Sequence, residues 1–441
     1  MRRTILLMAT MALTLLVASG LVLVAGGGSA AADSSVVGPG ESIQKAVYAA
    51  DPGDTIVVKG VHREDVVIRK NGIKLRGDDA VIEAPTTAKA DSPCSKVTGT
   101  EAICVIGDVN FNTGELTGPR VRDVSVSGFT MRGFKNKGKR GSKPRVIDVF
   151  GARNATFVGN RLIGNVAGGM AVFRCVNTTI AKSHVIGSPQ TIADGILVEA
   201  SSRTTVVNNV VRRIPQFEEG QNGIQVVEGI DTTISGNDLI ANFTGVLDEN
   251  STETKILSNH ISRSGDTGIV IFGQKSQDAK VVGNNISGGA EGIFVTDTHG
   301  GSVLGNTVRD NCAGMFFEAF GPVGDFKVVG NTVEDNTRSC RAAQFDRNFS
   351  GIGIALLGAR GMEVKANHLS GNVPSGPTRI SGGVVVSTDP YFGVTAKPKN
   401  NSVTGNTFGR NKPDIFYDKS GSGNSFVGNL CNTSVPTSLC N

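Results

Sequence analysis

Residues 292–308 read GIFVTDTHGGSVLGNTV, and this stretch contains both elements of a unit that repeats along the chain. The first element is a glycine followed by alternating apolar residues, Gly292-Ile293-Phe294-Val295. The second is a turn with asparagine at its centre, Leu304-Gly305-Asn306-Thr307-Val308. Self-similarity at a short period is the sequence signature of a stacked repeat architecture.

Both elements recur at matching intervals. The turns are 22 to 39 residues apart and centre on Asn160, Asn237, Asn259, Asn284, Asn306, Asn331, Asn367, Asn406 and Asn429, with Ser183 and Asn209 in the remaining registers. The glycine-led segments begin at Gly169, Gly195, Gly223, Gly245, Gly268, Gly292, Gly314, Gly353 and Gly383. The alternating, often β-branched residues after each glycine predict short strands.

A unit of this size cannot bury its own apolar face, but stacked units can, at about 4.8 Å per coil. Aligning the repeats gives two inward-facing apolar columns, which contain Ile293 and Val295 in the quoted stretch. Asparagine suits the turn because it tolerates the left-handed backbone and can hydrogen-bond to the next coil's asparagine. The prediction is an all-β, single-stranded, right-handed parallel β-helix of about 14 coils, roughly 65 Å long.

The N-terminal and C-terminal segments of the sequence indicate how the two ends of the solenoid are closed. Residues 1–32 resemble a signal peptide, with Arg2 and Arg3 before a long apolar run and small residues before Asp33. We expect cleavage there, and an uncleaved membrane anchor is the alternative. The β-helix domain would span residues 33–441, with residues 41–50 forming an N-terminal capping helix and residues 431–440 a C-terminal disulfide loop.

The composition of the chain limits the cellular compartment and the classes of partner that we expect. The net charge of +5 is too small to indicate nucleic acid binding. No segment after residue 32 is apolar enough to span a membrane, so we expect a secreted monomer. Cysteines of an exported protein are mostly paired. Sequence proximity suggests Cys94–Cys104 and Cys431–Cys440, and a separation of about one coil suggests Cys312–Cys340, which leaves Cys175 as an apolar filler.

The chain resembles the pectin-lyase-like right-handed β-helix superfamily over essentially all of its mature part. The entry Ser42-Ile43-Gln44-Lys45-Ala46 followed by Pro52-Gly53-Asp54-Thr55-Ile56 is similar to the usual start of that fold. The ending, with Gly423-Asn424-Ser425-Phe426 and Leu439-Cys440, resembles secreted β-helix repeat proteins of actinobacteria. The resemblance implies a fold but no single activity, because the superfamily contains lyases, hydrolases, epimerases and adhesins.

In this superfamily, active sites lie on the outward side of one strand column. Here the glycine-led strands present an apolar strip outward, comprising Ala171, Leu197, Gln225, Leu247, Val270, Phe294, Phe316, Ala355 and Val385. One interpretation is that loops at 212–221, 335–350, 371–382 and 388–401 cover the strip. The alternative is a ligand surface with Phe294 and Phe316 as stacking platforms.

Acidic side chains beside the strip are the candidate catalytic residues. They are Asp194, Glu199, Glu228, Glu249, Asp297 and Glu318, together with His299, which Asp297 could orient as a general base. Glu199 and Glu249 would lie about 9.6 Å apart along the axis. Scattered acids on a solvated face are the structural alternative. The polygalacturonase motifs and the Asp-Pro-His motif of alginate epimerases are missing.

Two functions remain open at this level. The first is an enzyme acting on extracellular acidic polysaccharide, of the lyase or uronan epimerase class. Its acids would hold Ca²⁺ or transfer protons, and the basic segment 132–145 would help to bind the polymer. The second is a non-catalytic module that binds a glycan or a cell-surface partner. The sequence identifies no cofactor and does not decide whether the protein is an enzyme.

Overall fold

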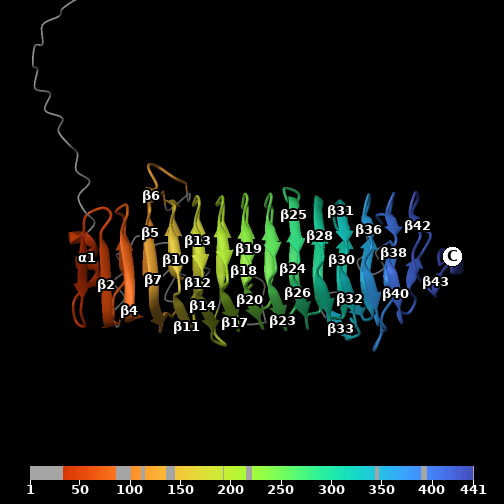
Figure 1. The fold of residues 1–441 in the computed structure, drawn as a ribbon, viewed down its shortest axis with the longest axis horizontal. Helices are drawn as coiled ribbons and strands as arrows, with labels where there is room; N and C mark the ends of the chain where they lie inside the picture. Colours follow the sequence, from red (N-terminus) through yellow and green to blue (C-terminus); the bar gives the residue numbers. More distant parts are fainter. Residues whose placement is uncertain are drawn as a thin grey trace, which may run out of the picture.

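The computed structural model describes residues 33–85, 101–110, 115–135, 145–191, 193–214, 221–342, 347–388 and 395–440. These residues form a straight rod of stacked coils, with the helix α1 at one end and β43 at the other (Figure 1). The predicted signal peptide, residues 1–32, lies outside the described residues. The predicted all-β parallel β-helix with one short N-terminal helix is confirmed.

One face of the rod is a 14-stranded parallel sheet, called here the glycine-led sheet. The fourteen strands agree with the predicted number of coils. They are β3 (Val66–Ile68), β5 (Ile103–Ile106), β8 (Arg145–Phe150), β12 (Gly168–Phe173), β15 (Ile196–Glu199), β18 (Ile224–Val227), β21 (Val246–Glu249), β24 (Thr267–Phe272), β27 (Glu291–Thr296), β30 (Ala313–Glu318), β35 (Ile352–Leu357), β38 (Gly382–Ser387), β41 (Ile415–Tyr417) and β43 (Ser434–Val435).

The rest of each coil belongs to a 25-stranded parallel sheet, which begins with four strands: β1 (Ser34–Val37), β2 (Thr55–His62), β4 (Lys74–Glu83) and β7 (Ser125–Arg132). After β7 this sheet divides into two stacks, because the β7 residues 125–127 pair with β10 and residues 130–132 pair with β11. The turn with asparagine at its centre makes this division, since it interrupts the strand in each later coil.

The stack that continues from β10 contains β10 (Thr156–Val158), β13 (Thr179–Ala181), β16 (Thr205–Val207), β19 (Thr233–Ser235), β22 (Lys255–Leu257), β25 (Gln277–Val282), β28 (His299–Leu304), β31 (Gly324–Val329), β36 (Glu363–Lys365), β39 (Ser402–Thr404) and β42 (Ser425–Val427). The stack from β11 contains β11 (Arg161–Asn165), β14 (His184–Gly187), β17 (Val210–Arg212), β20 (Asp238–Ile240), β23 (His260–Ser262), β26 (Asn285–Ser287), β29 (Thr307–Arg309), β32 (Thr332–Glu334), β37 (His368–Ser370) and β40 (Thr407–Gly409). Two small pairs complete the fold: β6 (Val121–Arg122) with β9 (Ala152–Arg153), and the antiparallel β33 (Cys340–Ala342) with β34 (Arg347–Phe349).

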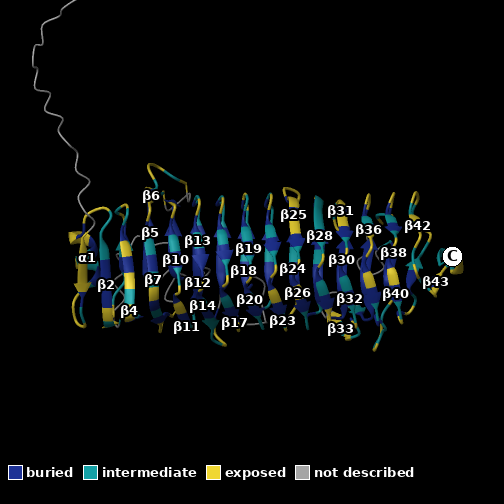
Figure 2. Ribbon diagram, viewed as in Figure 1, coloured by how far each residue is buried: buried dark blue, intermediate teal, exposed yellow. Residues whose placement is uncertain are grey.

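The core runs continuously along the axis, and buried segments recur in every coil (Figure 2). The two predicted inward columns are confirmed in register and in burial. Ile269 lies opposite Val246 and Ile293, and Ile271 lies opposite Asp248 and Val295. Every residue of both columns is at most 1% exposed. Burial of this aliphatic surface, which no coil achieves alone, is the main favourable term for stacking.

The predicted asparagine ladder is present inside the rod. Asn284 Oδ1 accepts hydrogen bonds from Asn259 N at 2.9 Å and Asn259 Nδ2 at 3.0 Å, while Asn284 Nδ2 donates to Asn306 Oδ1 at 3.0 Å and to Ile256 O at 2.8 Å. One side chain therefore links successive coils. The prediction that the asparagine itself is left-handed is wrong. The residue before each asparagine adopts that conformation, such as Ser258 at φ 52° or Gly283 at φ 65°.

A second ladder lies one turn further along each coil. Asn311, Asn336, Asn372 and Asn411 follow the first ladder by five residues and repeat the same bonds, for example Asn336 Nδ2 to Asn372 Oδ1 at 3.0 Å. Sequence analysis did not identify this second ladder. Its members lack the regular apolar flanks that mark the first one.

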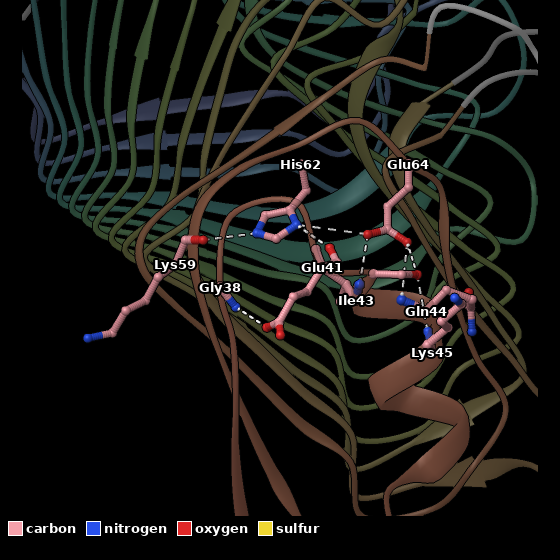
Figure 3. Close-up of polar contacts among 9 residues, drawn as sticks. Gly38, Glu41, Ile43, Gln44, Lys45, Lys59, His62 and Glu64 are labelled. Atoms are coloured by element: carbon pink, nitrogen blue, oxygen red, sulfur yellow. Dashed lines mark hydrogen bonds and ion pairs between the residues drawn. The ribbon is translucent and has the colours of Figure 1, made fainter.

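The helix α1 (Ile43–Ala49) caps the first coil, with Ile43 and Val47 buried against it. Glu64 holds the start of the helix, because its carboxylate accepts from Ile43 N at 2.7 Å, Ser42 Oγ at 2.9 Å and Gln44 N at 3.2 Å (Figure 3). The Gln44 side chain bonds Val67 N at 2.6 Å and Val67 O at 3.1 Å, so it pairs with the edge of β3. Helix and side chain together cover an edge that would otherwise be open.

Disulfides connect loops to the solenoid. Cys312–Cys340 and Cys431–Cys440 are formed as predicted. Cys104 is disulfide-bonded, and its predicted partner Cys94 lies outside the described residues. Cys175 is a free, buried cysteine, and burial raises the pKa of its thiol to about 11. A thiol in this environment remains protonated and packs as an apolar group.

Asp248 is the single charged residue in the second inward column. It is 0% exposed, and its Oδ1 accepts from Thr254 Oγ1 at 3.1 Å. The strand β21 continues through Glu249 in register, so Asp248 stays on the inward side, and hydroxyl groups supply its partners. Burial raises the pKa of this carboxyl to about 6.

Replacing Asn284 by alanine removes one step of the first ladder. Both Asn259 donors then lose their acceptor inside the rod, which should cost about 3 kcal/mol of unfolding free energy. The adjacent Asn285 is exposed, so Asn285→Ala should change stability by less than about 0.5 kcal/mol. Urea unfolding followed by circular dichroism measures both. Equal midpoints for the two variants would show that the ladder does not stabilise the fold.

The Asp248 carboxyl predicts a pH-dependent stability. Because its pKa rises from 3.8 in the unfolded chain to about 6 in the folded protein, the folded state holds the proton more tightly. Stability is therefore full below pH 4 and is lost as the pH rises through 6, by about 3 kcal/mol. Asp248→Asn should match the native protein at pH 4 and exceed its urea midpoint at pH 8. Asp65, whose pKa is also raised to about 6, is present in both proteins. A stability difference that stays constant with pH would contradict this account.

Candidate functional site

The outward strip of the glycine-led sheet is covered at its two ends. At the N-terminal end, Cys104, Ile106 and Phe150 form a small buried cluster, with Phe173 packed against it. At the C-terminal end a larger cluster buries Phe316, Ala355, Leu357 and Val385 under the residues Phe349 and Ile380. The predicted loops 335–350 and 371–382 thus do cover part of the strip. The predicted covers at 215–220 and 389–394 lie outside the described residues.

Between these covers the strip is partly open. Gln225, Leu247, Val270 and Phe294 are half-buried, and they succeed one another in register across β18, β21, β24 and β27. This stretch is called the open face. The predicted loop cover is therefore confirmed for the C-terminal end of the strip, while the ligand surface stays a prediction for its half-buried middle.

The two predicted stacking platforms have different environments. Phe316 is 0% exposed and its ring lies 5.7 Å from that of Phe349, so it is a core residue and not a platform. Phe294 is half-buried, and its ring centroid lies 6.3 Å from that of Phe320, which is 44% exposed. The pair Phe294–Phe320 is the aromatic surface that a ligand on the open face would meet.

Three of the candidate acids form one group beside the open face. Glu199 and Glu249 end β15 and β21 on the outward side, and Val227 lies between them in register. Glu228 follows Val227 in a left-handed corner at φ 50°. Desolvation raises the pKa of Glu249, and the negative charges of Glu228 and then Glu199 raise it further. Both causes favour the protonated form of the Glu249 carboxyl.

One cation lies beside this group. Lys275 Nζ is 3.5 Å from Glu228 Oε1, and both side chains are largely exposed. On the Glu199 side, the backbone N–H of Arg174 donates to Glu199 O at 3.0 Å, which joins the two main chains. An exposed pair such as Lys275–Glu228 adds little stability. It leaves a cation beside the carboxylates that a ligand could recruit.

Asp194 is separate from the three glutamates. It is 1% exposed, and Arg145 Nη2 lies 3.2 Å from its Oδ2, across Gly168 in the intervening coil. Asn222 donates to Asp194 Oδ1 through both N and Nδ2 at 3.1 Å. With its amide group turned toward the carboxylate, Gln225 donates as well, at 3.1 and 3.2 Å. A carboxylate with this many donors orients its neighbours and is saturated as a hydrogen-bond acceptor.

The remaining candidates lie further along the rod. Glu318 is 0% exposed beneath the C-terminal cover. Asp297 occupies a left-handed corner at φ 54°, and its Oδ1 is buried without a hydrogen-bond partner among the described residues. His299 is exposed, and within the described part of the chain no hydrogen bond joins it to Asp297. The expected Asp297–His299 pair is therefore not preformed.

Metal ligation receives no support from the described ranges. Within them, no group of three or more histidine, cysteine, aspartate or glutamate side chains is arranged to hold a metal ion. The register places His184, His260 and His368 in one column, three and four coils apart. The glutamate group therefore does not fit the Ca²⁺ ion that we considered from the sequence.

Two residues near the site were not identified from the sequence. Arg145 is 5% exposed, and its guanidinium lies 5.9 Å from the ring centroid of Phe173 as well as beside Asp194. Asp148 is 0% exposed, although its register position is on the outward strip beside Ala171. Arg145 had been assigned to a basic surface segment, of which residues 136–144 lie outside the described residues. No local pattern distinguishes a buried arginine from its exposed neighbours.

Comparison with known families identifies part of the solenoid. Residues 194–350 match the family described as "Right handed beta helix region". This match covers β15 to β34 and confirms the predicted right hand of the coils. No curated protein sequence matches the chain. Among the described residues, no helix is long and apolar enough to cross a membrane.

Solved structures of the same architecture are distant in sequence. The A-module of the Azotobacter vinelandii mannuronan C-5 epimerase AlgE4 aligns with 88% of this chain and 94% of its own, at 15% identity and TM-score 0.49. A mannuronic acid specific polysaccharide family 6 lyase from human gut microbiota aligns over 90% and 85%, at 15% identity and TM-score 0.49. PfbA, a surface adhesin of Streptococcus pneumoniae, aligns over 87% and 86%, at 14% identity and TM-score 0.46. The sheet register and the family match together establish that this chain is a right-handed parallel β-helix protein.

Proposed function

We propose that this protein is secreted and acts on an extracellular acidic polysaccharide bound along the open face. Two disulfides within the described residues fit an oxidising compartment. The open face runs across successive coils from the Phe150–Phe173 cluster to the loop-covered cluster at its C-terminal end, so it offers a polymer an extended surface. The choice of an acidic polysaccharide as substrate rests on the extended shape of the open face and on the cation Lys275 beside it.

The observation that carries the proposal is the group of three glutamates beside an apolar floor, in which burial and the neighbouring carboxylates raise the pKa of Glu249. A carboxyl whose pKa is raised by burial and by neighbouring carboxylates is the usual form of a general acid. Glu199, two coils away on the same outward column, lies about 9.6 Å from it along the axis. That spacing accommodates a pyranose ring between the two carboxyl groups.

This arrangement can perform the first step shared by lyases and epimerases of uronic acids. Glu199 takes the proton from C5 of a bound uronate as the general base, and the developing negative charge spreads onto the uronate carboxylate. In elimination, the C4–O4 bond then breaks, Glu249 gives its proton to the leaving oxygen, and a C4–C5 double bond remains. In epimerisation, Glu249 returns a proton to C5 from the opposite face.

A non-catalytic glycan-binding module is the second candidate. The observation that favours it is the pair Phe294–Phe320, because a half-buried ring beside an exposed one offers a platform for the apolar face of a sugar. Under this alternative Glu249 contributes to binding only. The two functions differ in whether the bound polymer is altered.

The purified protein should generate unsaturated uronate, detected by absorbance at the wavelength of the C4–C5 double bond, from one of alginate, polygalacturonate or glycosaminoglycan. Epimerisation should appear as a change in the NMR anomeric signals of the same polymers. Glu249→Gln should reduce the rate by about 10²- to 10⁴-fold, because the proton donor is lost. Glu253→Gln, an exposed carboxyl on the following corner, serves as the matched control and should retain full activity.

The rate of the native enzyme should also fall as the pH rises through the raised pKa of Glu249, since its proton is then lost. Tight binding of a polymer without any chemical change in it, in both assays, would favour the binding module. Equal activity of Glu249→Gln and Glu253→Gln would exclude Glu249 as the proton donor.

A further inference from the structure

A separate cavity of about 540 Å³ lies where β6 and the segment before it project from the rod (Figure 1). It adjoins the first coils of the glycine-led sheet, beyond the N-terminal cover of the strip. Basic side chains dominate its wall, which includes Arg69, Arg120, Arg122, Arg153, Asn71 and Asp108. Neither the open face nor the glutamate group contributes a residue to it.

The arginines come from three different parts of the chain, and the solenoid brings these parts together. β6 pairs with β9, which sets Arg122 opposite Arg153 in the neighbouring coil. Arg122 N donates to Asn71 Oδ1 at 2.8 Å, so the loop after β3 is tied to the same wall. Arg120 Nε donates to Arg174 O at 3.2 Å, which fixes its guanidinium at the rim. The cavity is therefore formed by positioned groups.

The charge of this wall is not balanced within the described residues. None of its four arginines forms an ion pair there, whereas Arg63, Arg132, Arg212 and Arg309 on the same rod all do. Asp108 is the one acid in the wall, and its carboxylate lies against Gly118, where a Cβ atom would approach Oδ2 to 2.7 Å. Four arginines and a single carboxylate thus line one concavity.

We infer that this cavity is a binding site for an anionic group, the sulfate or carboxylate of an acidic polysaccharide. Guanidinium groups present planar pairs of N–H donors that match such oxyanions in bidentate geometry. A concave site lined by several of them concentrates the favourable potential at one point. The assignment to a glycan rests on the proposed function, while the assignment to an anion rests on the cavity alone.

The cavity also has a fixed position relative to the glutamate group. Ile106 in its wall, Phe150, Phe173 and Glu199 occupy one outward register of β5, β8, β12 and β15. Three coils separate Ile106 from Glu199, which is about 14 Å along the axis. A charged chain held in the cavity could therefore extend over the stacked rings of Phe150 and Phe173 toward Glu199.

The test compares the double variant Arg122→Gln/Arg153→Gln with the control Arg161→Gln/Arg410→Gln, whose arginines are exposed elsewhere on the rod. Both are made in the full chain with Glu249→Gln, so that turnover does not change the ligand. Calorimetric titration measures binding of a sulfated hexasaccharide, a hexauronate, inorganic sulfate and a neutral maltohexaose. We expect charged oligosaccharides to bind at least about tenfold more weakly to the double variant than to the control. Neutral maltohexaose should not distinguish them.

The relative affinities for the sulfated sugar and the hexauronate identify which anionic group the cavity prefers, and competition by inorganic sulfate supports an anion site in either case. Equal binding of charged oligosaccharides to both variants overturns the proposal, as does an absence of binding to any anion. Arginine-dependent binding without turnover in the native protein would refute the proposed enzyme but keep the cavity. Turnover of the polymer without arginine-dependent binding would keep the proposed enzyme but refute the cavity as a binding site.

Discussion

The asparagine ladders inside the rod are the interaction on which the rest of the structure depends. Each ladder side chain accepts from the coil before it and donates to the coil after it, as Asn284 does between Asn259 and Asn306. These bonds satisfy amide groups that would be costly to bury alone. They also fix the register of every coil, because an asparagine that slipped by one residue would lose all its partners. The aliphatic columns drive stacking, and the ladders decide how the coils stack.

A fixed register is what gathers residues distant in sequence into one site. Glu199, Glu228 and Glu249 come from three successive coils, and their mutual repulsion exists only because the coils are held in step. The same constraint aligns the apolar floor from Leu247 to Phe294. Loops provide the variation on this frame: the hairpin β33–β34, tied by Cys312–Cys340, buries Phe316, while the middle of the strip stays open.

Much of the solenoid could be predicted from the sequence, because the same residue pattern recurs in many coils. The inward columns, the first ladder and two disulfide pairs were identified in this way. Contacts that occur only once in the chain could not be predicted in this way. Phe316 occupies the same repeat position as Phe294, yet a loop from outside the repeat buries it. Arg145 reaches Asp194 only because Gly168 lies between them. The hydroxyl partners of Asp248 depend on side-chain directions at a corner, which no periodicity specifies.

The site itself combines features that are visible in sequence only separately. Its acids stand in the aligned columns, but which of them converge depends on the loops that cover the strip. The most direct measurement is a crystal structure of the Glu249→Gln protein soaked with an oligouronate. The account predicts sugar rings along the open face, one of them between residues 199 and 249 and another against Phe294. A sugar chain bound to the 25-stranded sheet, or bound with no contact to residue 249, would contradict it.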